Sequence, residues 1–448
     1  MLRRRRSAFN APTLVYSPLV CSTLALLLSC SVCFAQNAGG SEVALTRPPS
    51  HAAIGIILGL LALLALAYLA GHPKIQELEQ RLGISNLVAT GLPFVALGLI
   101  ARHPTVGILS DEVVEDLTPM LEFGLGWIGF LTGFRFDFRV LEHVPQGTVR
   151  FATSLTGVSL VVVLGACVPL VLSFGHSWEH AEFLRDGAVL AAAAAVSVPT
   201  VRLLAGKTSA GRDALRWASA VDSVAALLVL LLIGAYFRPA SGHLDLPGSA
   251  WVLLTIGLGA TGGVLVYLTM LSPANTNEST VLTLGSVALI AGSAGYLRIS
   301  PLVVCFIAGI AIGNLPGAHG ETLRRALNTV ERPVLLFFYA MAGALWRVDD
   351  WRGWALLPAF VVARFLGRAI GIRLARRSHL LSEPGLEMRA TFAPMSELAL
   401  AIVLSVQMMY HGTAIPWIVT AVIGGAILSE FLVQLVSRGQ ESQEERAA

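Results

Sequence analysis

Long apolar stretches separated by short polar segments recur along most of the chain. Thirteen of them reach or approach the roughly 20 residues that a helix needs to cross a bilayer. They run approximately over residues 52–71, 84–101, 117–134, 148–174, 186–204, 214–236, 249–271, 280–296, 300–314, 333–346, 353–373, 389–410 and 415–436. The stretches 300–314 and 333–346 are short, so we expect helices that are tilted, broken or longer than the apolar run. The pattern predicts an all-α polytopic membrane protein with about 13 transmembrane helices.

The composition excludes a water-soluble globule. Of the 448 residues, 55% are hydrophobic and 13% are charged, whereas about a quarter are charged in a soluble domain. The mean hydropathy of +0.72 is spread over the whole length, so lipid must cover part of the apolar surface. The 43 glycines and 21 prolines suit kinked and closely packed spans. We expect no enzyme, no cofactor and no nucleic-acid partner.

The N-terminal segment has the three parts of a signal peptide, which we assign to residues 1–35. Arg3 to Arg6 precede an apolar run over 19–34, and the small residue Ala35 closes it. An uncleaved anchor is the alternative, and Cys30 follows a weak lipoprotein-like pattern. Cleavage removes four of the 31 basic residues and no acid, which changes the formal net charge from +3 to −1. Cys167 and Cys305 remain inside apolar spans, so we expect no disulfide and no metal site built on sulfur.

The loop charges predict the orientation. A cleaved signal peptide leaves an outer N-terminal segment (36–51), and thirteen spans over 52–436 then place the tail (437–448) in the cytoplasm. Basic residues concentrate in the loops that this assignment puts inside, as the positive-inside rule requires. They are Arg135, Arg139, Arg150, Arg202, Lys207, Arg212, Arg324, Arg325, Arg332, Arg376 and Arg377. We expect a multi-pass membrane protein with its N-terminus outside.

One carboxylate stands near the middle of a span. Asp222 is followed by an apolar run to Ala235, and Ser219 lies on the preceding turn. An ionisable residue at this depth costs about 2.5–3.5 kcal/mol and persists for a reason. Because burial disfavours the charged form, a proton and a cation can compete for such a carboxylate near neutral pH. The alternative is an aspartate held neutral or paired as a packing element.

Two spans carry interrupting prolines. Ser197, Pro199 and Thr200 lie within the apolar span before Asp222. About 195 residues later, Pro394 is followed by Ser396 and Glu397. Proline removes a backbone donor and leaves carbonyls free at membrane depth, and such broken helices line ion sites in transporters. One interruption in each half is the pattern of an inverted repeat, although a single proline is more often a simple kink.

Three further charged residues fall in the spans. Arg364 can pair with carboxylates or bind helix-end carbonyls. For Arg368 we favour extension of the side chain to the membrane interface. Glu122, early in its span, is either a surface residue or a gate. The sequence from His176 to His180 matches a zinc-protease pattern, but it lies in a short outer loop and we attribute it to chance.

Several segments, taken in chain order, match motifs of a known family. They are residues 97–100 with 107–110, 122–133 with 136–139, 300–314, 331–333 with 337, 338 and 343, and 396–401. Ser396-Glu397-Leu398-Ala399, for example, is similar to a late Gly-Glu-Phe/Leu-Ala motif. In these segments the chain resembles the sodium/proton exchanger superfamily, and more closely its bacterial monovalent cation:proton antiporter-2 branch. The resemblance covers approximately residues 52–436.

The resemblance implies a sodium/proton antiporter-like fold. It has inverted repeats, a dimerisation panel, and a mobile core with two crossed discontinuous helices. Pro199 and Pro394 match the broken fifth and twelfth helices, Asp222 matches the essential carboxylate of the sixth, and Arg364 matches the basic residue of the eleventh. The chain departs from the family where Val221 replaces a polar neighbour of the carboxylate. Val198 departs likewise, because many relatives have Thr-Asp-Pro where this chain has Ser197-Val198-Pro199.

With the resemblance, these observations predict a homodimeric secondary transporter of the bacterial inner membrane that exchanges Na⁺ or K⁺ for H⁺ by alternating access. Cation and proton would alternate at Asp222, aided by Ser197, Thr200, Ser219 or backbone carbonyls. One acid beside Arg364 favours electroneutral 1:1 exchange. Two alternatives stay open. Val198 and Val221 favour a non-transporting pseudo-exchanger that acts as a membrane sensor or subunit, and the third reading is a passive ion channel.

Overall fold

The structure of the protein is a computed structural model that describes residues 91–103, 109, 111–136, 138, 146–174, 182–198, 209–238, 246–270, 276–315, 320–375, 390–410 and 412–447. The chain divides into residues 1–45 and 46–448, and every described residue belongs to the second unit. The expected signal peptide, outer segment and first span (52–71) lie outside the described residues. Pro199 and Thr200 lie outside them as well.

The regular secondary structure of the described residues is helical, and short non-helical segments connect the helices. Its helices are α5 (Leu92–Arg102), α6 (Asp111–Asp116), α7 (Thr118–Phe134), α9 (Gln146–Ser173), α10 (Glu182–Ala195), α12 (Ser209–Tyr236), α13 (Gly248–Met270), α14 (Thr276–Tyr296), α15 (Pro301–Asn314), α16 (Gly320–Leu345), α17 (Trp351–Ala375), α19 (Glu397–Met409) and α20 (Ile415–Ala447). Six of these are long and apolar enough to cross a membrane, namely α9, α12, α13, α14, α17 and α20. The prediction of an all-α polytopic membrane protein is confirmed.

Proline and serine mark where several helices begin. Pro93, Pro119 and Pro301 lie in the first positions of α5, α7 and α15, where a missing N–H breaks no helical hydrogen bond. Ser396 precedes α19, and its hydroxyl accepts a hydrogen bond of 3.1 Å from the Leu398 N–H. A helix therefore starts directly after the interruption expected at Pro394.

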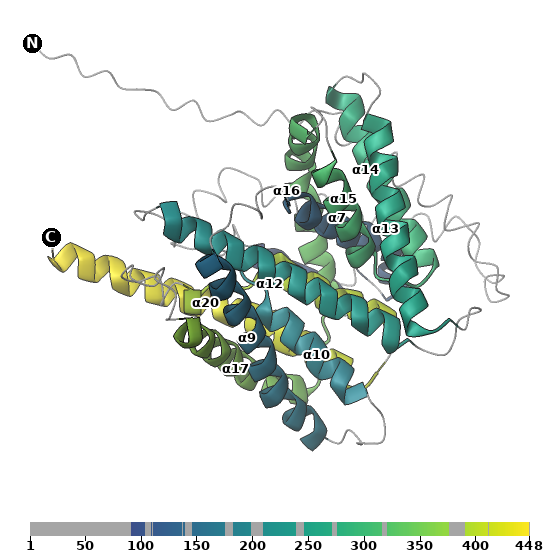
Figure 1. The fold of residues 1–448 in the computed structure, drawn as a ribbon. Coiled ribbons are helices and arrows are strands. Elements are labelled where there is room, and N and C mark those ends of the chain that lie inside the picture. Colours follow the sequence, from purple (N-terminus) through teal and green to yellow (C-terminus); the bar gives the residue numbers. More distant parts are fainter. Residues whose placement is uncertain are drawn as a thin grey trace, which may run out of the picture. The chain divides into compact units, whose positions relative to one another are not determined.

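The helices pack into two groups. Helices α5, α7, α13, α14, α15 and α16 contact chiefly one another and form what we call the panel group. Helices α9, α10, α12, α17, α19 and α20 form the core group. Figure 1 shows α13, α14 and α15 together in one region and α9, α10 and α17 together in another. Contacts between the groups come mainly from α12 and α19.

Glycine permits a close helix contact within the panel group, between α7 and α15. A Cβ atom at Gly129 would lie 2.1 Å from the carbonyl oxygen of Leu302, and one at Gly309 would lie 2.2 Å from that of Phe130. These separations are too short for any side chain. The two backbones therefore touch directly, as small residues allow in membrane helix packing.

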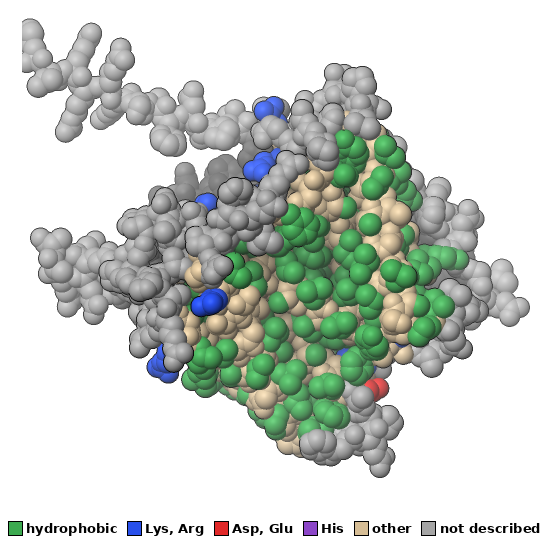
Figure 2. Space-filling model, viewed as in Figure 1, with side chains coloured by type: hydrophobic (Ala, Val, Ile, Leu, Met, Phe, Trp, Pro, Cys, Tyr) green, Lys and Arg blue, Asp and Glu red, His purple; other side chains and the backbone are tan. Residues whose placement is uncertain are grey.

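Large apolar side chains are exposed along the outer helices. On α13 they are Leu253, Ile256, Val264, Leu265 and Leu268. Figure 2 shows a face on which hydrophobic side chains predominate over α12, α13 and α14. A soluble monomer rarely exposes so wide an apolar surface. The face suits contact with lipid.

Candidate ion-binding site

Two interrupted helices cross in the core group. Helix α10 ends at Ala195, and residues 196–198, which follow it, are not helical. Ser197 forms an isolated antiparallel bridge with Met395, in the extended segment that leads into α19. The Val198 N–H donates to the Pro394 carbonyl at 3.1 Å. The crossing thus brings the end of one helix and the beginning of another to the same place.

The last carbonyls of a helix lack partners within the helix, and here Arg364 of α17 binds them. Its Nη1 donates to the carbonyl oxygen of Ala194 and, at 3.2 Å, to that of Val196. Its Nη2 donates to the Ala393 carbonyl at 2.8 Å. One fully buried guanidinium therefore joins both interrupted helices, and its charge complements the negative end of the α10 dipole.

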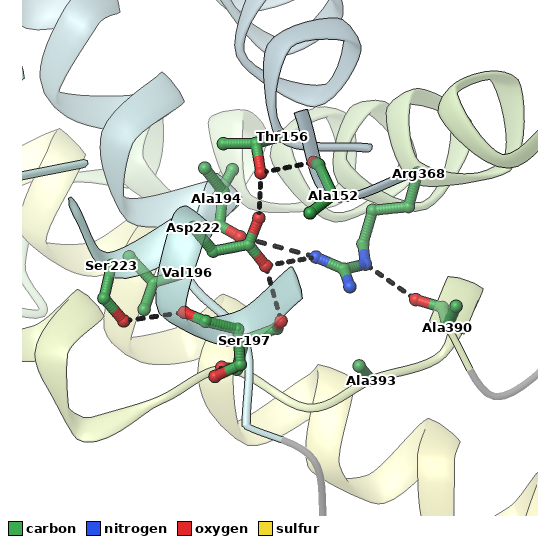
Figure 3. Close-up of polar contacts among 12 residues, drawn as sticks. Ala152, Thr156, Ala194, Val196, Ser197, Asp222, Ser223, Arg368, Ala390 and Ala393 are labelled. Atoms are coloured by element: carbon green, nitrogen blue, oxygen red, sulfur yellow. Dashed lines mark hydrogen bonds and ion pairs between the residues drawn. The ribbon is translucent and has the colours of Figure 1, made fainter. Parts of the chain in front are cut away.

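Arg368, one turn further along α17, connects the crossing to a carboxylate. Its Nε donates to the Ala390 carbonyl at 2.8 Å, and its Nη1 lies 3.4 Å from the Ala195 oxygen. The same Nη1 lies 3.3 Å from Asp222 Oδ2 and forms an ion pair with it. Figure 3 shows the guanidinium between Asp222 and Ala390. Arg368 is 1% exposed, so the pair is shielded from solvent.

Asp222 lies in the middle of α12 and is fully buried. Its Oδ1 accepts a hydrogen bond of 2.5 Å from Thr156 of α9. Its Oδ2 accepts one of 2.7 Å from Ser197 and also faces Arg368. Three elements therefore supply donors to one carboxylate (Figure 3). Burial of a charge is tolerated only with such complete pairing.

Comparison with known proteins identifies the family. The family model for "Sodium/hydrogen exchanger, transmembrane" matches residues 53–437. The chain belongs to the sodium/hydrogen exchanger family. The expected resemblance is thereby confirmed, and the exchanger is a membrane transporter rather than an enzyme.

Solved structures show the fold of the exchanger. It is similar to the sodium proton antiporter MjNhaP1 from Methanocaldococcus jannaschii at pH 8, with a TM-score of 0.62 and 14% sequence identity, over 84% of this chain and 98% of that one. An electron-microscopy map of the same antiporter gives a TM-score of 0.56 at 15% identity, over 86% of this chain and 96% of that one. No curated protein matches the chain by sequence. The expected antiporter-like fold is confirmed.

The exchanger brings together several of the residues singled out in the sequence. Asp222, Ser197 and Arg364 all lie at the crossing. Ser219 supports it indirectly, because its hydroxyl donates to the Ser197 carbonyl at 2.6 Å and not to the carboxylate. Pro394 is buried in the extended segment before α19. Thr200, an expected cation ligand, and Pro199, expected to interrupt its helix, lie outside the described residues.

The remaining candidates have other surroundings. Ser396 caps α19, and Glu397 is the half-buried first residue of that helix. Glu122 lies on α7, where its Oε2 would be 2.2 Å from a Cβ atom at Gly295 of α14. It belongs to the panel group. Val221 packs against an apolar cluster that includes Phe151 and therefore adds no polar atom beside Asp222.

The expectation that Arg368 extends to the membrane interface is wrong. Glycines on α17 allow a close approach to α9, because Cβ atoms at Gly367 and Gly371 would lie 2.9 Å from the Cα atoms of Ser159 and Leu155. The side chain is thereby enclosed beside Asp222. A sequence signal existed, since residues four apart share one helix face. If the Arg364 side chain faces the interior of the core group, the side chain of residue 368 faces it as well.

Thr156 was missed in the sequence. Its helix carries several hydroxyl residues among apolar ones, and a threonine there commonly bonds to its own helix. Only the packing of α9 against α12 places this hydroxyl on Asp222. Among the described residues, no three His, Cys, Asp or Glu side chains gather as a metal site. Any cation held here would be cargo bound by Asp222, hydroxyls and carbonyls.

Proposed function

We propose that this exchanger moves Na⁺ or K⁺ against H⁺ by alternate occupation of Asp222. The observation that carries the proposal is the fully buried Asp222 carboxylate at the crossing of two interrupted helices. Unwound carbonyls and hydroxyls near such crossings are the ligands by which transporters hold small cations. Ser197 Oγ and the nearby carbonyls of Ala195 and Val196 supply oxygens of that kind.

Competition at one carboxylate couples the two fluxes. A bound cation takes the position opposite the carboxylate that the Arg368 guanidinium now holds 3.3 Å from Oδ2. A bound proton neutralises the carboxylate and removes the attraction for a cation. Because a proton and a cation exclude each other at Asp222, the site carries either a proton or a cation each time it moves from one side of the membrane to the other. With one acid at the crossing, we infer electroneutral 1:1 exchange.

Alternating access requires relative movement of the two helix groups. The core group carries the described residues of the crossing, and hydrogen bonds join it to the panel group. One is the hydroxyl pair of Ser300, before α15, and Ser405, in α19, 2.7 Å apart. Another joins Gln407 Nε2 of α19 to the Leu345 carbonyl of α16 at 3.1 Å. These contacts can break and re-form while the crossing stays intact.

The loop charges bear on the orientation in the membrane. We infer a homodimer in a bacterial inner membrane, with the N-terminus outside and the C-terminus in the cytoplasm. The arginine-rich loops support this orientation.

Proteoliposomes with an entrapped pH dye test the function. An imposed Na⁺ or K⁺ gradient should drive proton movement in the wild type, and Asp222→Asn should abolish it. Asp349→Asn is the matched control, because Asp349 is exposed and lies outside the crossing. Equal activity of the wild type and Asp222→Asn would refute the carboxylate mechanism.

The same assay separates the alternatives. A non-transporting sensor, which Val198 and Val221 favour, would show no flux in any variant. A channel would pass the cation without proton coupling. Collapse of the membrane potential with a potassium ionophore adds a test of stoichiometry, because electroneutral exchange should continue unchanged.

A further inference from the structure

Thr156 makes two contacts that its single hydroxyl proton cannot satisfy together. Its Oγ1 lies 2.5 Å from Asp222 Oδ1 and 2.9 Å from the Ala152 carbonyl oxygen. Thr156 is 3% exposed, so no solvent competes for the hydroxyl. An ionised carboxylate and a carbonyl are both acceptors. The hydroxyl can therefore donate to only one of them while Asp222 is charged.

Protonation of Asp222 resolves this conflict. A protonated carboxyl group becomes a donor through its O–H. Oδ1 can then donate to Thr156 Oγ1, and the threonine proton turns to the Ala152 carbonyl. When Asp222 loses its proton, the threonine proton turns back to Oδ1. The same pair of distances therefore fits both protonation states.

The two carboxylate oxygens have different surroundings. Oδ2 accepts from Ser197 and faces the Arg368 guanidinium. A proton on Oδ2 would face a positive charge, whereas the contact of Oδ1 among the described residues is with the Thr156 hydroxyl. We propose that Oδ1 carries the proton, that Oδ2 faces the transported cation, and that Thr156 is a positioning residue whose hydroxyl reverses its direction with each change of protonation.

This proposal rests on the proposed function of Asp222 as the shared site. The charged groups that face Asp222 are Arg368 and, beyond it, Arg364, both on α17. The one charged residue of α9 and those of α10 lie in the first turns of these helices, away from the crossing. On α12 the nearest charged residue along the described helix is the exposed Arg216, and α19 begins with Glu397. None of these replaces the Oδ1 contact of Thr156.

The test compares Thr156→Val with Thr156→Ser. Valine is close in size to threonine and removes the hydroxyl, whereas serine retains it. Loss of the hydroxyl removes a charge-assisted bond from the ionised form and a weaker neutral bond from the protonated form. The acid limb of the exchange pH profile should therefore move upward by about one pH unit in Thr156→Val. Thr156→Ser should keep the wild-type limb.

Thr153→Val is the matched control. Thr153 lies on the same helix, is exposed, and bonds only to carbonyls of its own helix among the described contacts. Its pH profile should equal that of the wild type. Thr156→Ala provides a second hydroxyl-free variant if the valine protein does not accumulate.

An infrared titration of the purified exchanger gives a readout without transport. The carboxylic C=O band that vanishes in Asp222→Asn belongs to Asp222. Its titration midpoint should rise in Thr156→Val or Thr156→Ala, and its frequency should change. An unchanged midpoint and frequency, or a serine variant that behaves like valine, would overturn the role of Thr156. If Asp222→Asn itself transports like the wild type, the proposed function fails instead.

Discussion

Arg368 Nη1 lies 3.3 Å from Asp222 Oδ2, and both side chains are buried, so the exchanger holds an ion pair in its interior. The guanidinium is thus a tethered cation beside the carboxylate to which we assign the transported ion in our proposal. A buried pair of this kind contributes less through its attraction than it costs when one partner is removed. That asymmetry allows the pair to be tested by stability measurements.

Arg368→Gln should destabilise the purified exchanger by about 3–5 kcal/mol near neutral pH, because it leaves the Asp222 carboxylate without its cation. The loss should shrink at acid pH, where a protonated carboxyl needs no counter-charge. Thermal unfolding in detergent at several pH values measures both effects.

The double variant Arg368→Gln/Asp222→Asn should recover much of that stability, since neither partner then carries a charge. Arg373→Gln, an exposed position on the same helix, is the control. Strictly additive losses in the double variant would contradict the ion pair.

Arg364 should be intolerant of lysine. Its guanidinium reaches carbonyls of both interrupted helices, Val196 on one side and Ala393 on the other. A lysine ammonium is a point charge and lacks the planar fork that spans the two. We expect Arg364→Lys to lower the exchange rate at least tenfold, while Arg373→Lys leaves it unchanged. Full activity of Arg364→Lys in proteoliposomes would show that charge alone suffices.

The sequence predicted the spans, the central carboxylate and the two interruptions, because each depends on local composition. An aspartate in an apolar run, or a proline in one, is visible without a neighbour. Arg368 was misjudged although its spacing of four residues from Arg364 places both on one helix face. Thr156 was missed because its role depends on which helix faces which, and only the packing of α9 against α12 decides that its hydroxyl meets Asp222.

The Ser300 and Ser405 hydroxyls form a buried pair between the panel and core groups, 2.7 Å apart. Ser405→Ala leaves Ser300 without this partner and should cost about 1–3 kcal/mol of stability. Adding Ser300→Ala should cost little more, since the pair is already broken. Ser429→Ala serves as the control, because the Ser429 hydroxyl bonds to the Ala426 carbonyl of its own helix. Thermal unfolding of Ser405→Ala, Ser300→Ala, the double variant and Ser429→Ala measures these losses, and a double-variant loss equal to the sum of the two single losses would argue against direct coupling.

Gly309 should tolerate no larger residue, because α7 and α15 touch through their backbones. A Cβ atom at Gly309 would lie 2.2 Å from the Phe130 carbonyl oxygen, and backbone cannot move aside as a flexible side chain can. Gly309→Ala should therefore separate the helices and strongly reduce the yield of folded protein. Gly292→Ala on α14 is the matched control, since a Cβ there meets no atom within 4 Å and alanine favours a helix by about 1 kcal/mol over glycine. Size-exclusion profiles and unfolding temperatures of the two variants should diverge in opposite directions from the wild type. Equal behaviour of the two would mean that the α7 and α15 backbones are not in direct contact.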